Sequence, residues 1–258
     1  MNTLRFAPLH PFLGLTAAAL LACSAGAQLT EWPTTVKPGR FLIEMDAISL
    51  TLDREEDFKY TAFGAASVFL TTGVTQNLDV QVGAEFLITQ RIETSGFTDR
   101  STGVGDVYVR TKWRFFEAKD SYNAAAIIPW VKIPTNSGGV GNDAVEGGII
   151  LPWEARFPGG INLYAMAELD FLRNDADDGY DTDWFGSMAL SRQLIGGIGA
   201  YAEIAGGKSS GGGSFEGTMG GGVTWAVREY AWWDFAVYRG ITRGAADWNP
   251  VVRFNVEF

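Results

Sequence analysis

The sequence LDVQVGAEFLITQR, from Leu78 to Arg91, alternates apolar and polar side chains along most of its length. The sequence GVGDVYVRTKWRFF, from Gly103 to Phe116, shows the same alternation after a polar stretch. Successive side chains of a β-strand point to opposite faces, so both sequences predict strands with one apolar and one polar face. The region from Leu78 to Phe116 therefore predicts one β-hairpin, with Thr94 to Thr102 as its polar loop.

Two kinds of sheet have this alternation. A soluble sheet buries its apolar face in a core, whereas a transmembrane barrel exposes its apolar face to lipid and its polar face to the lumen. Each half of the hairpin exceeds the usual strand length of about 5–6 residues and suits a tilted crossing of about 9–11 residues. The unit also recurs to the last residue. We therefore predict an all-β fold, an antiparallel up-and-down transmembrane β-barrel of about 12 strands.

The connections between the predicted strands alternate in length, and this alternation favours the membrane barrel. Outer-membrane barrels have short periplasmic turns and longer external loops. The short set is VTQN, EAKDS, PGG, LIG and REY, and the long set is LDREEDFK, SGFTDRSTG, PTNSGGVGND, RNDADDGYD, GGKSSGGGS and TRGAAD.

Residues 1–27 have the features of a signal peptide. Arg5 precedes an apolar run from Phe12 to Leu21, and the small residues Ala25 to Ala27 form a cleavage site. Lipidation at Cys23 within the sequence LLAC is the alternative, and the sequence does not decide between them. Residues 28–38 predict a short periplasmic lead-in, too small to plug a barrel, and residues 39–258 predict the barrel.

Removal of residues 1–27 excludes several functions. The mature chain has no Cys and no His, so disulfides, Cys-based zinc sites and His-dependent catalysis are excluded. It has 19 Lys and Arg residues against 30 acids, a formal charge of 19 − 30 = −11, which disfavours nucleic acid. We predict no enzyme activity, no catalytic residue, no metal site and no cofactor.

The polar faces of the predicted strands line the lumen. This set is Glu44, Asp46, Asp79, Glu85, Arg91, Asp106, Arg110, Lys112, Arg114, Lys132, Glu146, Glu154, Arg156, Glu168, Asp170, Glu203 and Arg253. Acids and bases on neighbouring strands are expected to pair, with Arg110, Lys112 and Arg114 as a basic row beside acids of the preceding strand. Such a set either orients permeants by its electric field or braces a narrow barrel by salt bridges, and both interpretations stay open.

The chain ends in the alternating sequence VVRFNVEF, with Phe258 as the last residue. A terminal aromatic residue on such a strand resembles the signal that the barrel-assembly machinery recognises. The predicted partners are therefore outer-membrane lipids, that machinery and a small-molecule permeant, in a Gram-negative outer membrane.

Four segments together resemble one protein family. They are Pro38-Gly39, TTGVTQNLDVQVGAEF (Thr71 to Phe86), GVGDVYVRTKWRF (Gly103 to Phe115) and IIPWVKIPT (Ile127 to Thr135). They are similar to the outer-membrane family associated with the meta-pathway of phenol degradation. The resemblance implies an outer-membrane barrel with a role in the uptake of aromatic or other hydrophobic molecules.

Two functions follow as hypotheses. The first is a passive channel or uptake protein for small, aromatic or hydrophobic molecules. The second is a non-transporting structural or surface-interaction barrel, whose lumen is closed by salt bridges. The sequence identifies neither the permeant nor the oligomeric state.

Overall fold

A computed structural model describes residues 29–119, 123–174, 176 and 178–258 of the 258-residue chain. The predicted signal peptide, its cleavage site, Cys23 and Gln28 lie outside the described residues. No helix in the described part is long and apolar enough to cross a membrane.

The described chain is built from β-strands. Their bounds are β1 (Phe41–Glu55), β2 (Phe58–Thr75), β3 (Leu78–Thr94), β4 (Phe97–Gly103), β5 (Val107–Glu117), β6 (Asn123–Ile133), β7 (Glu146–Phe157), β8 (Ile161–Arg173), β9 (Tyr180–Ile195), β10 (Ile198–Ser209), β11 (Gly212–Arg228), β12 (Ala231–Gly240) and β13 (Trp248–Glu257).

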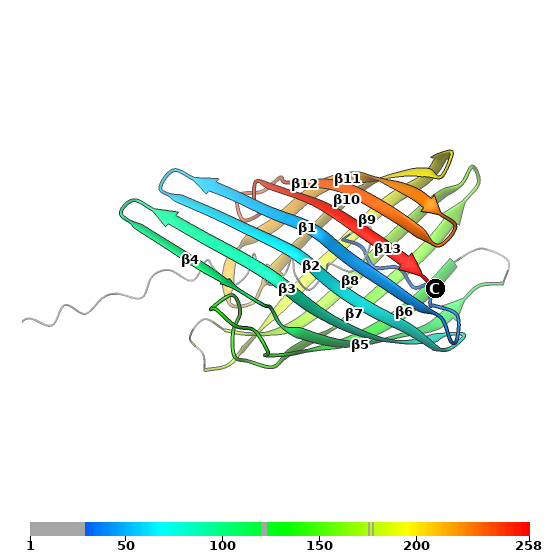
Figure 1. The fold of residues 1–258 in the computed structure, drawn as a ribbon, viewed down its shortest axis with the longest axis horizontal. Coiled ribbons are helices and arrows are strands. Elements are labelled where there is room, and N and C mark those ends of the chain that lie inside the picture. The colour runs from blue at the N-terminus through cyan, green and yellow to red at the C-terminus, as the bar shows by residue number, and fades with distance from the viewer. Residues whose placement is uncertain (1–28, 120–122, 175, 177) are drawn as a thin grey trace, which may run out of the picture.

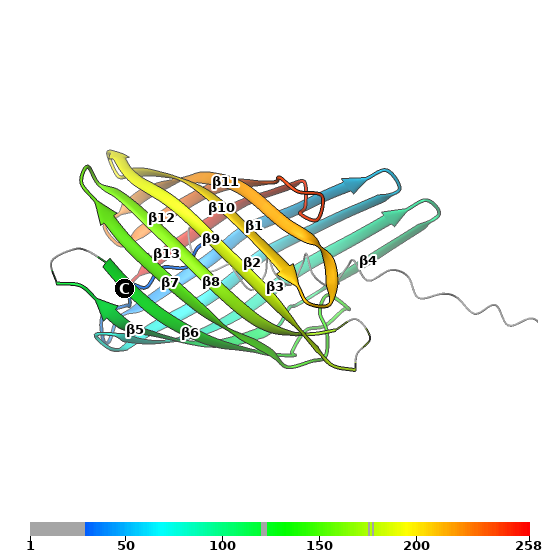
Figure 2. The ribbon, with the colours of Figure 1, turned by 180° about the vertical axis from the view of Figure 1, so that it is seen from behind.

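These strands close into one barrel (Figures 1 and 2). Apart from β4 and β5, each strand pairs antiparallel with its sequence neighbours, and β1 pairs with β13 to close the sheet. β4 and β5 both pair with β3 in one continuous register, interrupted at residues 104–106, so together they form one position in the wall. The described residues thus form a twelve-stranded antiparallel barrel, as predicted. An even number is usual for bacterial barrels of this kind.

The predicted alternation of short turns and long loops is wrong for half of the long set. The sequences expected to form the first, second and fifth long loops instead continue the strands: β1 and β2 are joined by Glu56 and Asp57, and β4 occupies much of the loop expected at Thr94 to Thr102. The hairpins β1–β2 and β3–β4 extend far toward the end opposite the C-terminus (Figure 1). Their charged side chains do not prevent pairing, because an extended hairpin satisfies its backbone groups by ladder hydrogen bonds.

The outside of the barrel is apolar and its interior is polar. Large apolar side chains such as Val82, Leu151, Leu190, Ile204 and Phe235 are exposed on the outer surface. The buried charged side chains of the wall, among them Asp46, Arg110 and Glu203, lie inside. A transmembrane barrel needs apolar side chains on its outer face, which contacts lipid, and polar side chains facing its lumen.

The alternation changes phase at one level of the wall. In β3, Glu85 and Ile88 are both buried, while the intervening Phe86 and Leu87 are exposed. β2 has a positive φ of 56° at Ala66, a conformation that is uncommon for a residue other than glycine. In β1 the register with β13 shifts between Asp46 and Ile48. Beyond this level, the opposite set of side chains in β1–β3 faces the lumen.

Candidate functional site in the barrel lumen

The segment 29–37 lies inside the barrel and makes contacts deep in the lumen. The backbone N–H groups of Leu29 and Thr30 donate hydrogen bonds to the Glu203 carboxylate at 3.0 and 2.6 Å. Farther along the segment, the N–H of Val36 donates to Asp79 at 3.0 Å. The prediction of a periplasmic lead-in is therefore wrong for Leu29 to Val36, which lie within the lumen. A short extended chain fits beside the side chains of a twelve-stranded wall, and the wall supplies acceptors for its backbone.

Glu31 holds the middle of this segment in place. Its carboxylate lies 2.9 Å from Arg110 Nη1 and 3.7 Å from Lys112 Nζ, and all three side chains are buried. Burial opposes the ionisation of Glu31, but the charges of Arg110 and Lys112 outweigh burial and lower the pKa of Glu31 below its ordinary value. The cluster is therefore an ionised, buried bridge between the segment and β5.

Other contacts fix the orientation of the two bases. Arg110 Nε donates to Gln81 Oε1 at 2.9 Å, and the Arg110 guanidinium lies 4.1 Å from the centre of the Phe69 ring. Lys112 Nζ lies 5.8 Å from the centre of the Trp32 ring. The expected pairing of this basic row with acids of the preceding strand is therefore wrong. Although Lys112 is opposite Asp79 in the ladder, Asp79 accepts from the segment instead.

A second cluster joins the first and last strands of the barrel. Arg253 on β13 donates to Asp46 at 2.7 Å and to Asp234 at 3.3 Å. Tyr201 also donates to Asp234, at 3.0 Å, and Tyr238 donates to Glu203 at 2.9 Å. The acceptor of the segment 29–30 is thus part of the same polar layer that links β1, β10, β12 and β13.

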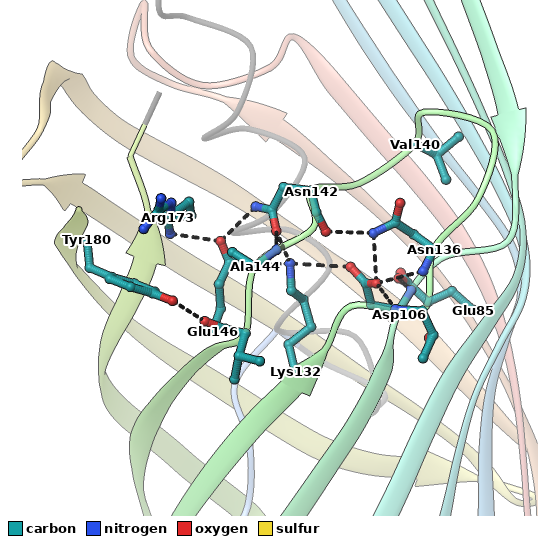
Figure 3. A network of polar contacts seen from close by, with 12 residues as sticks. Glu85, Asp106, Lys132, Asn136, Val140, Asn142, Ala144, Glu146, Arg173 and Tyr180 are labelled. Carbon is teal, nitrogen blue, oxygen red and sulfur yellow. Dashed lines mark hydrogen bonds and ion pairs between the residues drawn. The ribbon is translucent and has the colours of Figure 1, made fainter. Parts of the chain in front are cut away.

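A third cluster anchors the loop between β6 and β7 (Figure 3). Lys132 Nζ lies 2.7 Å from Glu146 and 3.3 Å from Asp106. The Asp106 carboxylate also accepts the backbone N–H of Thr135 at 2.8 Å and of Asn136 at 3.0 Å. Because these contacts converge on two carboxylates, the loop is tied to the inner wall at the end of the barrel opposite the C-terminus.

Comparison with known proteins adds to this geometry. Residues 27–258 match the family described as "Putative MetA-pathway of phenol degradation". The chain belongs to this family. Among curated proteins, no match was found.

Several solved structures have a similar fold. An outer-membrane channel from Pseudomonas putida F1 is 9% identical, with a TM-score of 0.69, covering 88% of this chain and 98% of that chain. The translocator domain of the autotransporter NalP from Neisseria meningitidis is 12% identical, with a TM-score of 0.58 and coverages of 97% and 99%. The transport unit of the autotransporter AIDA-I from Escherichia coli is 9% identical, with a TM-score of 0.58 and the same coverages. This family member therefore has the β-barrel fold of these outer-membrane proteins.

Most of the charged residues predicted to line the lumen are buried in it. These are Glu44, Asp46, Asp79, Glu85, Asp106, Arg110, Lys112, Lys132, Glu146, Glu154, Glu168, Asp170, Glu203 and Arg253. Three predicted residues lie elsewhere. Arg114 and Arg156 lie near the turns at the C-terminal end, where Arg114 donates to the carbonyl of Gln76 and Arg156 to Glu154.

Arg91 was predicted to face the lumen, and that prediction is wrong. Its side chain is 54% exposed and pairs with Glu93 on the projecting part of β3. The phase change at Phe86 and Leu87 is the reason, because it moves Arg91 from the inner to the outer face.

Sequence reasoning missed the groups that complete this site. Glu31 lies in a segment without alternation, so no pattern indicated that it faces the lumen. Ile88 and Phe69 are apolar residues that the structure buries, on the two sides of the phase change. The sequence did indicate that Tyr108 and Tyr201 face the lumen, because both occupy polar positions of alternating strands.

Proposed function

We propose that this protein is a passive outer-membrane channel for small apolar or aromatic molecules. The observation that carries the proposal is the lumen itself, a closed wall occupied by a segment that is held by hydrogen bonds, ion pairs and side-chain packing. About eight strands leave a lumen filled by side chains, and 16–18 leave a water channel, so twelve strands give an intermediate width. A segment of this size then restricts the lumen, and its displacement opens it.

One comparison supports a channel, and another supports its permeant class. The similar structure from Pseudomonas putida F1 is described as an outer-membrane channel. The family is described by a pathway of phenol degradation. An organism that degrades phenol takes up small aromatic molecules, and their passage through a narrow lumen needs no catalytic residue.

Single-channel recording in a planar bilayer tests the proposal. We expect the refolded mature protein to give small discrete conductance steps, which phenol alters. A variant lacking residues 29–36 is the matched comparison, and we expect it to conduct more strongly because the lumen is then free of the segment. Silence of both proteins, with a folded and heat-modifiable barrel, would contradict a channel function.

The alternative is a non-transporting barrel with a closed lumen. The buried bridges of Glu31 with Arg110 and Lys112 favour it, because they tie the segment to the wall. This alternative predicts conductance only after residues 29–36 are removed, and no response of the intact protein to phenol.

Besides a permeant, the barrel-assembly machinery is a proposed partner of this protein. Phe258 exchanges two backbone hydrogen bonds of 2.9 Å with Phe41, and their rings stack with centres 5.8 Å apart. The Phe258 side chain remains 58% exposed, which leaves it accessible for recognition. We expect Phe258→Ala to reduce assembly in cells while refolding in detergent stays normal. An equal loss in both settings would indicate that Phe258 only closes the barrel.

A further inference from the structure

A cavity of about 80 Å³ lies inside the wall formed by β1, β2 and β3, beside the tip of the lumen segment. Leu29 lines it from the segment, and Ile88, Tyr238 and Val251 line it from the wall. These four side chains are buried, with exposed fractions of 2–7%. The cavity borders the second charge cluster, because Asp46, Tyr238 and Arg253 belong to that cluster and also line the cavity.

The phase change in the wall creates this cavity. It turns Ile88 inward at the level where regular alternation from Glu85 would place Leu87 and Thr89. On β2 the inward position at this level is Gly64, and a Cβ added there would lie 2.5 Å from Ser49 Oγ. Ile88 and Gly64 are therefore opposite each other in the ladder between β3 and β2. Ile88 supplies an apolar side chain at this level, and Gly64 has no side chain.

Three polar side chains that line the cavity have buried atoms without a partner. Tyr60 Oη, Glu85 Oε1 and Asn249 Oδ1 make no hydrogen bond within the described part of the chain. The three residues are 4%, 7% and 8% exposed. Burying a polar atom without a partner costs free energy, so each atom favours a ligand that supplies the missing hydrogen bond. Together they offer one hydroxyl donor and two oxygen acceptors.

The charges around the cavity select against anions. The carboxylates of Asp46 and Glu85 line it, together with the single cation Arg253. Arg253 is already paired with Asp46 and Asp234, so its charge is compensated within the wall. An anionic ligand would therefore be placed beside an unpaired carboxylate oxygen of Glu85 at low dielectric.

We propose that this cavity binds one neutral, apolar molecule that carries a hydroxyl group. The hydroxyl donates to Glu85 or Asn249 and accepts from Tyr60, while the apolar part packs on Ile88 and Leu29. An apolar cavity of about 150 Å³ binds benzene, so the smaller volume here limits the ligand to a single ring seated with some displacement of Leu29. The site rests on the proposed function, because it gives the permeant a binding position beside the segment.

Fluorine NMR titration of the mature protein in detergent tests the site with three matched probes. These are para-fluorophenol, fluorobenzene and para-fluorobenzoate. We expect para-fluorophenol to bind more tightly than fluorobenzene, and para-fluorobenzoate to bind weakest. Equal affinity for the three probes would overturn the proposal.

Variants locate the binding. Tyr60→Phe removes one hydroxyl, and we expect it to weaken para-fluorophenol about 3- to 10-fold while fluorobenzene is unchanged, as the loss of one hydrogen bond implies. Ile88→Trp fills the cavity and abolishes binding of both probes. The control Val82→Trp, which adds the same side chain on the outer surface of β3, leaves both affinities unchanged. If Ile88→Trp does not fold, the selective effect of Tyr60→Phe decides the question alone.

Binding and conductance measured together distinguish failure of this binding site from failure of the proposed channel function. Binding that depends on Tyr60, in a protein without conductance, supports the site and refutes the channel. Conductance altered by phenol, with an affinity that Ile88→Trp and Tyr60→Phe do not change, supports the channel and overturns this site.

Discussion

The substitution Glu31→Gln removes the charge that ties the lumen segment to the barrel wall. Glu31 is the partner of two buried bases, Arg110 at 2.9 Å and Lys112 at 3.7 Å. The amide of Gln keeps the size of the side chain but removes the carboxylate that contacts both cations. We therefore expect the segment to leave the lumen in a large fraction of the molecules.

The magnitude follows from the burial of the cluster. Removing one partner of a buried ion pair costs about 3–5 kcal/mol, because the remaining charge stays buried and unpaired. Since about 1.4 kcal/mol corresponds to a factor of ten, the equilibrium between the docked and released segment shifts by roughly two to three and a half powers of ten. The hydrogen bonds to Glu203 and Asp79 remain and oppose release.

Thiol labelling measures this release directly. The mature chain has no cysteine, so Thr30→Cys provides a single label at a position that is 0% exposed. In this background we expect Glu31→Gln to raise the labelling rate about a hundredfold or more, the lower end of the shift in docking. Glu56→Gln, in the exposed β1–β2 turn, is the matched control and leaves the rate unchanged. A rate unaffected by Glu31→Gln would refute the conclusion that this ion pair holds the segment.

Three further results are expected. Because the pKa of Glu31 is lowered from 4.5, the ionic docking is complete above that value and is lost as the pH falls through the lowered pKa. The increase in conductance that Glu31→Gln produces over the unchanged protein is then the same at every pH above 4.5 and shrinks only below it, and a shrinkage at higher pH would contradict this. Arg253→Leu leaves two carboxylates unpaired and lowers the free energy of unfolding by about 3–5 kcal/mol, measured by denaturant titration of the refolded barrel, whereas an unchanged transition would refute the structural role of this cluster. Gly83→Ala places a Cβ 2.6 Å from the Phe69 ring and costs about 1–3 kcal/mol in the same assay, while the control Gly186→Ala, whose nearest atom is at 3.5 Å, changes stability little.

The alternation of apolar and polar residues was sufficient to predict the strands and most of the side chains that face the lumen. A period of two depends only on backbone geometry, so the alternation around Val82 and Arg110 predicted which side chains face outward and which face inward. The pattern could not give the continuation of β1 into Asp53 and Glu55 as a hairpin. That continuation depends on a partner strand, and the charged sequence alone resembled a loop.

The sequence by itself determined a lipid-exposed wall with a charged interior, because each strand encodes its own two faces. Only the tertiary structure decided three features of the site: Glu31 inside the lumen, Arg91 outside it, and the apolar cavity beside Ile88. The position of Glu31 depends on Arg110 and Lys112, which are far away in the chain. The phase change depends on three strands meeting at Ala66 and its neighbours. Such contacts exist only after the barrel closes, and no period within one strand records them.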